Sequence, residues 1–154
     1  MELKTKIHAE DNKQDLKITR EFELPLELLF KAYIEPELVE QWMGTKVLKL
    51  DNKDHGSYHF ETTDPKGDVH VFHGTIHTFI PNEAITRTFE MEKTPFPVQL
   101  EFISFKPLTS KTSKLEIHII YKSVEDRDNM LKLPFKQGVN MAHNKLEEIM
   151  QRSN

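Results

Sequence analysis

Residues 135–149 of the chain read FKQGVNMAHNKLEEI. The apolar residues in this stretch recur at steps of four, three, four and three, which is the spacing of one face of an α-helix. Pro134, immediately before it, suits the start of that helix. A continuous apolar stripe has to be covered by another element of the protein, so this helix packs against a second layer. The stripe consists of Phe135, Val139, Ala142, Leu146 and Ile149.

Strand patterns fill the middle of the chain and supply that second layer. We expect strands over residues 47–50, 56–63, 69–80, 85–91, 98–105 and 114–121. Strands at such short spacing, with no helices between them, indicate an antiparallel sheet. The segment Asp64-Pro65-Lys66-Gly67 fits a bulged type I hairpin turn in which Gly67 has a positive φ angle. That turn would place His59 directly opposite His73 on neighbouring strands.

The N-terminal part combines an arm, a strand and two short helices. Residues 1–15 are mostly polar and predict an N-terminal arm or an edge strand, followed by a single domain over residues 16–154. Residues 16–24 alternate as a half-buried strand. Pro25 and Pro36 suit the first turns of two short helices, and Gly44 ends the second. The element order predicts an α+β fold with a curved antiparallel sheet of about six to seven strands around a long C-terminal helix.

Composition excludes several classes of protein. The 154 residues correspond to one domain, and no apolar run approaches the ~18 residues of a membrane-spanning helix. A net charge of −4 gives no sign of a nucleic-acid-binding surface. The absence of cysteine excludes thiol nucleophiles, disulfides and cysteine-built metal centres. The first residues lack the apolar core of a signal peptide, so we expect a cytoplasmic protein.

Motifs for catalysis and metal binding are weak. The chain has no Gly-x-Ser-x-Gly elbow and no glycine-rich phosphate loop, so we predict no catalytic residues and no cofactor. His59, His73 and Glu61 share one sheet face and are the best candidates for metal ligands. The other face of the same strands carries Tyr58 and Phe60, which makes the histidine face the solvated one. We therefore predict no metal site.

The element order and several short motifs resemble the activator of Hsp90 ATPase homologue-like family, within the START-like (Bet v 1-like) superfamily. The resemblance covers about residues 16–151 and implies the helix-grip fold, in which a curved sheet holds one long helix. It implies no shared catalytic residue. Relatives often carry a tryptophan where this chain has Val139. The matching stretches are ITREF at 18–22, LFKAY at 29–33, PELVEQW at 36–42, GSYHF at 56–60 and DPKG at 64–67.

A curved sheet that holds one long helix either has a filled core or leaves an apolar cavity beside the helix. The cavity predicts a binding module for a small hydrophobic or amphipathic ligand. The alternatives are a co-chaperone-like protein that acts through its surface, and a cyclase or hydrolase-type enzyme with Thr62, His70 or Arg87 as the polar group in the cavity. The sequence identifies no protein partner. The expected lining is Trp42, Tyr58, Phe60, Phe72, Ile76, Phe89, Phe102, Ile117, Phe135 and Val139.

Overall fold

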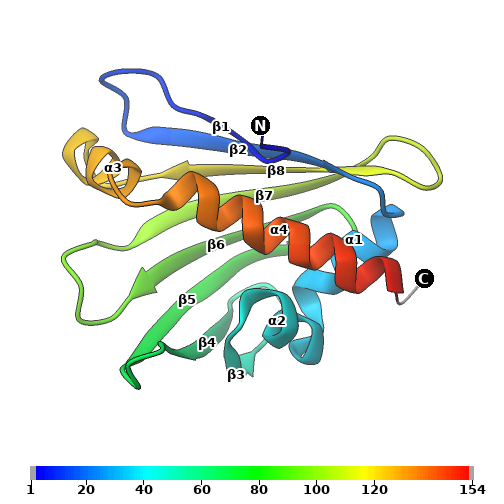
Figure 1. Ribbon diagram of the computed structural model, residues 1–154, viewed down its shortest axis with the longest axis horizontal. Coiled ribbons are helices and arrows are strands. Elements are labelled where there is room, and N and C mark those ends of the chain that lie inside the picture. The colour runs from blue at the N-terminus through cyan, green and yellow to red at the C-terminus, as the bar shows by residue number, and fades with distance from the viewer. Residues whose placement is uncertain (1–2, 153–154) are drawn as a thin grey trace.

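An eight-stranded antiparallel sheet is the largest element of the computed structural model, which describes residues 3–152 (Figure 1). The spatial order is β1-β2-β8-β7-β6-β5-β4-β3. The sheet has one strand more than the upper expectation because residues of the N-terminal arm form β1 along one edge. The strands are β1 (Lys6–His8), β2 (Asp15–Phe22), β3 (Lys46–Leu50), β4 (Gly56–Thr63), β5 (Val69–Ile80), β6 (Ala84–Met91), β7 (Gln99–Pro107) and β8 (Ser113–Ile120).

Two short helices carry the chain from one side of the sheet to the other. The helix α1 (Leu26–Ile34) follows β2, and α2 (Pro36–Met43) leads into β3 at the opposite edge. Glu35 between them is extended, as expected for a residue before proline. Gly44 has a φ angle of 64° and ends α2 in the left-handed conformation. The two helix ends predicted from proline and glycine are therefore confirmed.

The β4–β5 hairpin has the predicted register. The N–H of Gly67 donates to the carbonyl oxygen of Asp64 at 2.9 Å, and Gly67 has a φ angle of 92°. His59 lies opposite His73, with ring centroids 6.3 Å apart. The turn chemistry thus fixes which residues of these two strands point into the protein.

The long helix α4 (Phe135–Arg152) lies across the inner face of the sheet (Figure 1). The shorter α3 (Val124–Leu131) precedes it and begins at Ser123, whose hydroxyl oxygen accepts the N–H of Asp126. Leu146, the fourth residue of the predicted stripe, is completely buried. Among residues 3–152, no helix is long and apolar enough to cross a membrane.

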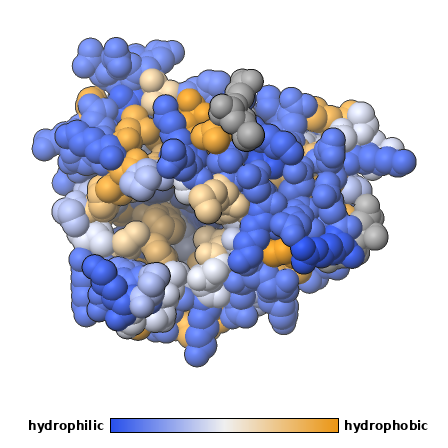
Figure 2. All heavy atoms as spheres, in the orientation of Figure 1, coloured by the Kyte–Doolittle hydropathy of each residue, from blue (hydrophilic) through white to orange (hydrophobic). Residues whose placement is uncertain are grey.

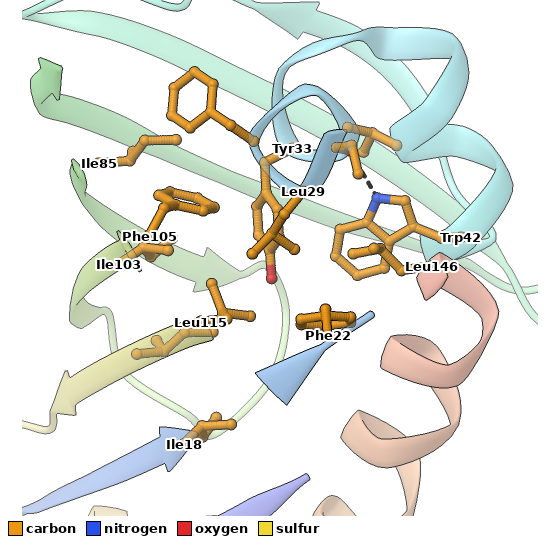
Figure 3. Packing of buried hydrophobic residues seen from close by; sticks show 14 of the residues in the cluster. Ile18, Phe22, Leu29, Tyr33, Trp42, Ile85, Ile103, Phe105, Leu115 and Leu146 are labelled. Atoms are coloured by element: carbon orange, nitrogen blue, oxygen red, sulfur yellow. Dashed lines mark hydrogen bonds between the residues drawn. The ribbon is translucent and has the colours of Figure 1, made fainter. Parts of the chain in front are cut away.

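Aromatic rings pack the end of the core where α1 and α2 meet the sheet (Figure 3). Phe30 packs edge-on against Phe105, with ring centroids 5.0 Å apart, and Tyr33 lies 5.1 Å from Trp42. The indole N–H of Trp42 donates to the carbonyl oxygen of Ala32 at 2.8 Å. This bond ties α2 to α1 and fixes the orientation of the only tryptophan in the chain.

A buried polar cluster joins α4 to the first two strands. We call it the Arg20 cluster. Arg20 points inward from β2, and its guanidinium donates to the carboxylate of Glu147 at 3.1 Å and to the side-chain oxygen of Asn144 at 2.8 Å. The hydroxyl of Thr5, in the arm, lies 2.9 Å from Nδ1 of His143. The sequence pattern placed most polar residues of α4 away from the core, whereas these face the sheet. The cluster consists of Thr5, Arg20, Asn140, His143, Asn144 and Glu147.

Candidate functional site

A pocket of about 350 Å³ lies between α4 and the inner face of the sheet. Figure 2, in the orientation of Figure 1, shows a hollow with apolar walls beside the first half of α4. Its volume falls at the lower end of the ~300–1,000 Å³ range of small-molecule sites. The apolar part of the wall comes from Ile18, Trp42, Met43, Phe89, Met91, Ile117, Ile119, Met130, Phe135, Val139 and Ala142.

Half of the ten residues predicted to line a cavity do line this pocket. They come from α2, β6, β8 and α4, which meet around it. Val139, the position where relatives often have a larger ring, is among them, so the pocket includes the space that such a ring would occupy. The five residues are Trp42, Phe89, Ile117, Phe135 and Val139.

Four of the other predicted residues belong to the packed interior beside the pocket. Tyr58, Phe60 and Ile76 are almost completely buried in the core. The rings of Tyr58 and Phe60 are 5.1 Å apart, and Phe72 is partly buried, 5.5 Å from the ring of Phe89. The aromatic residues of β4 and β5 therefore fill the region that the prediction left open. A filled core and a cavity coexist at different places along the sheet.

Phe102 is a clear error of the prediction. It is 38% exposed on the outer face of β7, and its ring lies 6.1 Å from that of His118 on β8. The neighbouring residues Glu101 and Ile103 are buried and point inward. Strand alternation allows only one of the two parities to face the core, and here the inward parity includes a charged residue. A prediction that places every apolar side chain of β7 on the inner face is therefore wrong for Phe102.

The polar end of the pocket is an ion pair between neighbouring strands. Arg87 on β6 lies directly opposite Glu101 on β7, and its Nε donates to a carboxylate oxygen of Glu101 at 3.0 Å. The amide nitrogen of Gln99 donates to the other oxygen at 2.8 Å. The Arg87 guanidinium also lies 4.9 Å from the ring centroid of Tyr58. Burial lowers the pKa of Arg87, but Tyr58 and Glu101 outweigh that effect, so the pKa is raised and the group stays charged.

Tyr33 adds a phenol to the same pocket. Its hydroxyl oxygen points away from α1, toward the space between the sheet and α4 (Figure 3). Burial raises the pKa of this phenol, so it keeps its proton at neutral pH and can donate a hydrogen bond. The pocket wall therefore carries five polar side chains among its apolar ones: Tyr33, Arg87, Gln99, Glu101 and His143.

Two of the three polar residues that we considered for an enzyme lie elsewhere. The hydroxyl of Thr62 donates to the hydroxyl of Thr45 at 3.0 Å. The ring of His70 lies 2.9 Å from the carboxylate of Asp64 at the hairpin turn. Only Arg87 reaches the pocket. The described residues that line the pocket include no serine, threonine or lysine, but they do include His143, whose Nδ1 lies 2.9 Å from the hydroxyl of Thr5.

The histidine face of the sheet pairs with carboxylates. Nε2 of His73 lies 3.5 Å from Glu90 and 3.3 Å from Glu92. Across residues 3–152, no three histidine, aspartate or glutamate side chains gather in an arrangement that could hold a metal ion. The candidate set of His59, His73 and Glu61 therefore does not assemble in the described structure.

The sequence analysis missed Tyr33, Gln99 and Glu101 as pocket residues. A usable signal existed on β7, where Gln99 and Glu101 alternate with the same parity as Ile103 and Phe105. Charged and amide residues in phase with core residues have to be paired inside the protein. Arg87 has the parity of Ile85 on the preceding strand and is the natural partner of Glu101.

A long C-terminal helix held by a curved antiparallel sheet, with a pocket between them, defines a helix-grip protein. The chain belongs to the family described as Activator of Hsp90 ATPase homolog 1-like protein, whose model matches residues 23–151. This family and this fold support a ligand-binding or co-chaperone-like module. The resemblance expected from the sequence motifs is confirmed.

Solved structures with the same fold come from several bacteria. A protein from Mycobacterium smegmatis has a TM-score of 0.81 at 20% identity, covering 94% of each chain. A protein from Arthrobacter aurescens has a TM-score of 0.86 at 13% identity, covering 96% of this chain and 91% of the other. A protein from Chromobacterium violaceum has a TM-score of 0.73 at 22% identity, covering 89% and 96%. None of the curated proteins compared matches this chain. At these identities the comparisons establish the fold.

Proposed function

We propose that this protein binds a small hydrophobic or amphipathic molecule in the pocket between α4 and the sheet. The observation that carries the proposal is the lining of that pocket. Eleven apolar side chains surround about 350 Å³, with a few polar groups at Arg87 and Glu101 and one more, His143, on α4. Binding sites for small molecules combine apolar walls and a small number of placed polar groups in this way.

Filling the pocket tests the proposal. Val139 lines it, so Val139→Trp introduces a ring into the space that a ligand would occupy. An uncharged, environment-sensitive dye titrated against the native protein should bind, and Val139→Trp should weaken that binding at least about tenfold, because the bound dye loses apolar contact area. The readout is dye fluorescence, together with circular dichroism to show that the variant folds.

Met141→Trp is the matched control. Met141 lies two residues away on the same helix and is 69% exposed, outside the pocket. The same ring added there should leave dye affinity unchanged. Absence of dye binding to the native protein, or an equal loss in both variants, would contradict the pocket as the binding site. Native mass spectrometry of the purified protein then shows whether a ligand-sized mass accompanies it.

The two alternative functions make different demands on the structure. An enzyme needs a reactive side chain in the pocket, and there Arg87 already pairs with Glu101 while His143 bonds to Thr5. A co-chaperone needs a protein partner on its surface. The ligand-binding function uses the pocket that the structure contains. We propose that the protein works in the cytoplasm, as expected from its sequence.

A further inference from the structure

Both oxygens of the Glu101 carboxylate already accept a hydrogen bond inside the protein. One oxygen accepts a hydrogen bond from Nε of Arg87 at 3.0 Å, and the other accepts from the amide nitrogen of Gln99 at 2.8 Å. The side chain of Glu101 is 9% exposed. Its negative charge is thus balanced by Arg87 before any ligand enters.

The donors around this ion pair are only partly used. Within residues 3–152, the two terminal nitrogens of Arg87 have no hydrogen-bond partner. The hydroxyl of Tyr33 has none either. The fully buried polar atoms without a partner are Nε of Arg20, Nε2 of His59 and the hydroxyl oxygen of Tyr121. The unpaired atoms of Arg87 and Tyr33 are not in this group, so they are not fully buried. The free donors of Arg87 and Tyr33 therefore face the open space of the pocket that both residues line.

The charges at the pocket wall restrict the charge state of the ligand. Arg87 and Glu101 form a neutral pair at the pocket wall. A carboxylate or phosphate would add an unbalanced negative charge close to Glu101, and a cation would add one close to Arg87. Either ion would lose its hydration in a mostly apolar space without a counter-charge of its own. An uncharged head group avoids this cost.

We propose that the ligand is an uncharged molecule with an apolar body and one carbonyl or hydroxyl oxygen, which accepts hydrogen bonds from Arg87 and Tyr33. The inference rests on the binding function proposed above and specifies its ligand class. The pocket volume of about 350 Å³ favours a small body, since sites for small molecules span ~300–1,000 Å³.

Four naphthalenes substituted at the same ring position test the head group. Acetylnaphthalene and hydroxyethylnaphthalene carry an acceptor oxygen, isopropylnaphthalene has the same number of non-hydrogen atoms without one, and naphthoate carries a charge. Each competes with the bound uncharged dye. We expect the acetyl and hydroxyethyl compounds to bind about fivefold or more tightly than the isopropyl compound, the gain typical of one to two net hydrogen bonds. Naphthoate should bind more weakly than both.

Tyr33→Phe identifies the donor. It removes the hydroxyl and keeps the ring that packs against Trp42 and Phe105. Affinity for acetylnaphthalene should fall about threefold to tenfold, while affinity for isopropylnaphthalene stays the same. Tyr121→Phe is the matched control, because that hydroxyl is buried without a partner and Tyr121 does not line the pocket. Replacement of Arg87 is less informative, since it would leave the carboxylate of Glu101 without its counter-charge.

The outcomes separate this inference from the function on which it rests. If the dye and all four naphthalenes fail to bind, ligand binding itself is wrong. If they bind but the isopropyl compound equals the acetyl compound, or naphthoate binds most tightly, the pocket binds ligands and the head-group inference is overturned. An unchanged ratio of acetyl to isopropyl affinity in Tyr33→Phe overturns it as well.

Discussion

Arg20 lies on the inward face of β2, where strand alternation places it in phase with Ile18 and Phe22. Its side chain is completely buried, so its charge has to be balanced inside the protein. Glu147 on α4 supplies the opposite charge, and the same carboxylate accepts the backbone N–H of Glu23 at 2.8 Å. A buried ion pair of this kind adds little net stability but strongly disfavours other placements of α4 on the sheet. The pair and its hydrogen bonds join α4 to β2 at one place along the sheet.

His143, in the same cluster, gives stability a pH dependence. Burial, and after it the charge of Arg20, lower the pKa of His143 from 6.5 to about 3. Between these two values the unfolded chain binds a proton that the folded protein does not, so stability falls as pH falls. From neutral pH to about pH 5 the loss from this residue is about 2 kcal/mol. Urea unfolding at the two pH values measures it.

Two glutamine variants show whether His143 is the cause. His143→Gln keeps a group that can bond to Thr5 but does not titrate, so its stability should vary less between neutral pH and about pH 5. His77→Gln removes an exposed histidine and should retain the full pH dependence of the native protein. A native protein as stable at about pH 5 as at neutral pH would contradict the neutral, buried state of His143.

The strands β2 to β8 could be predicted from the sequence to within two residues, and so could the starts of α1, α2 and α4. The period of apolar residues determines α4, and proline and glycine determine the ends of α1 and α2. The buried polar residues could not be predicted this way. Periodicity counts apolar side chains, so Asn140, His143 and Glu147 of α4 looked like surface residues. Their burial depends on Arg20, which is more than a hundred residues away in the sequence.

Leu146→Asp tests the role of α4 as the core helix. Leu146 is completely buried, so the variant would bury an unpaired carboxylate and should lose several kcal/mol of stability or fail to fold. Met141→Asp makes the same type of change at an exposed position of the same helix and should cost less than about 1 kcal/mol. Thermal melting followed by circular dichroism compares the two. Similar melting temperatures would show that α4 does not contribute the core contacts described above.

At the scale of the whole molecule, the pocket results from how the layers pack. The alternation of side chains along β4, β6 and β8 indicates which residues face inward. It does not indicate which of these residues contact one another. Tyr58 and Phe60 fill one part of the sheet, while Phe89 and Ile117 border a space that α4 leaves open. That difference depends on where α4 crosses the sheet, which no local pattern encodes. The structure therefore brings five of the ten predicted residues together at one pocket.

Ligand binding to this pocket should stabilise the entire fold, because the lining comes from β2, β6, β7 and β8 as well as from all four helices. A ligand that binds only the folded state, present at ten times its Kd, adds about 1.4 kcal/mol to the free energy of unfolding. For a chain of this size the melting temperature then rises by about 3–6 °C. Acetylnaphthalene should produce that rise in the native protein and in Met141→Trp, but much less in Val139→Trp, whose pocket is filled. An equal rise in all three proteins would mean that the ligand stabilises the fold from a site other than the pocket beside α4.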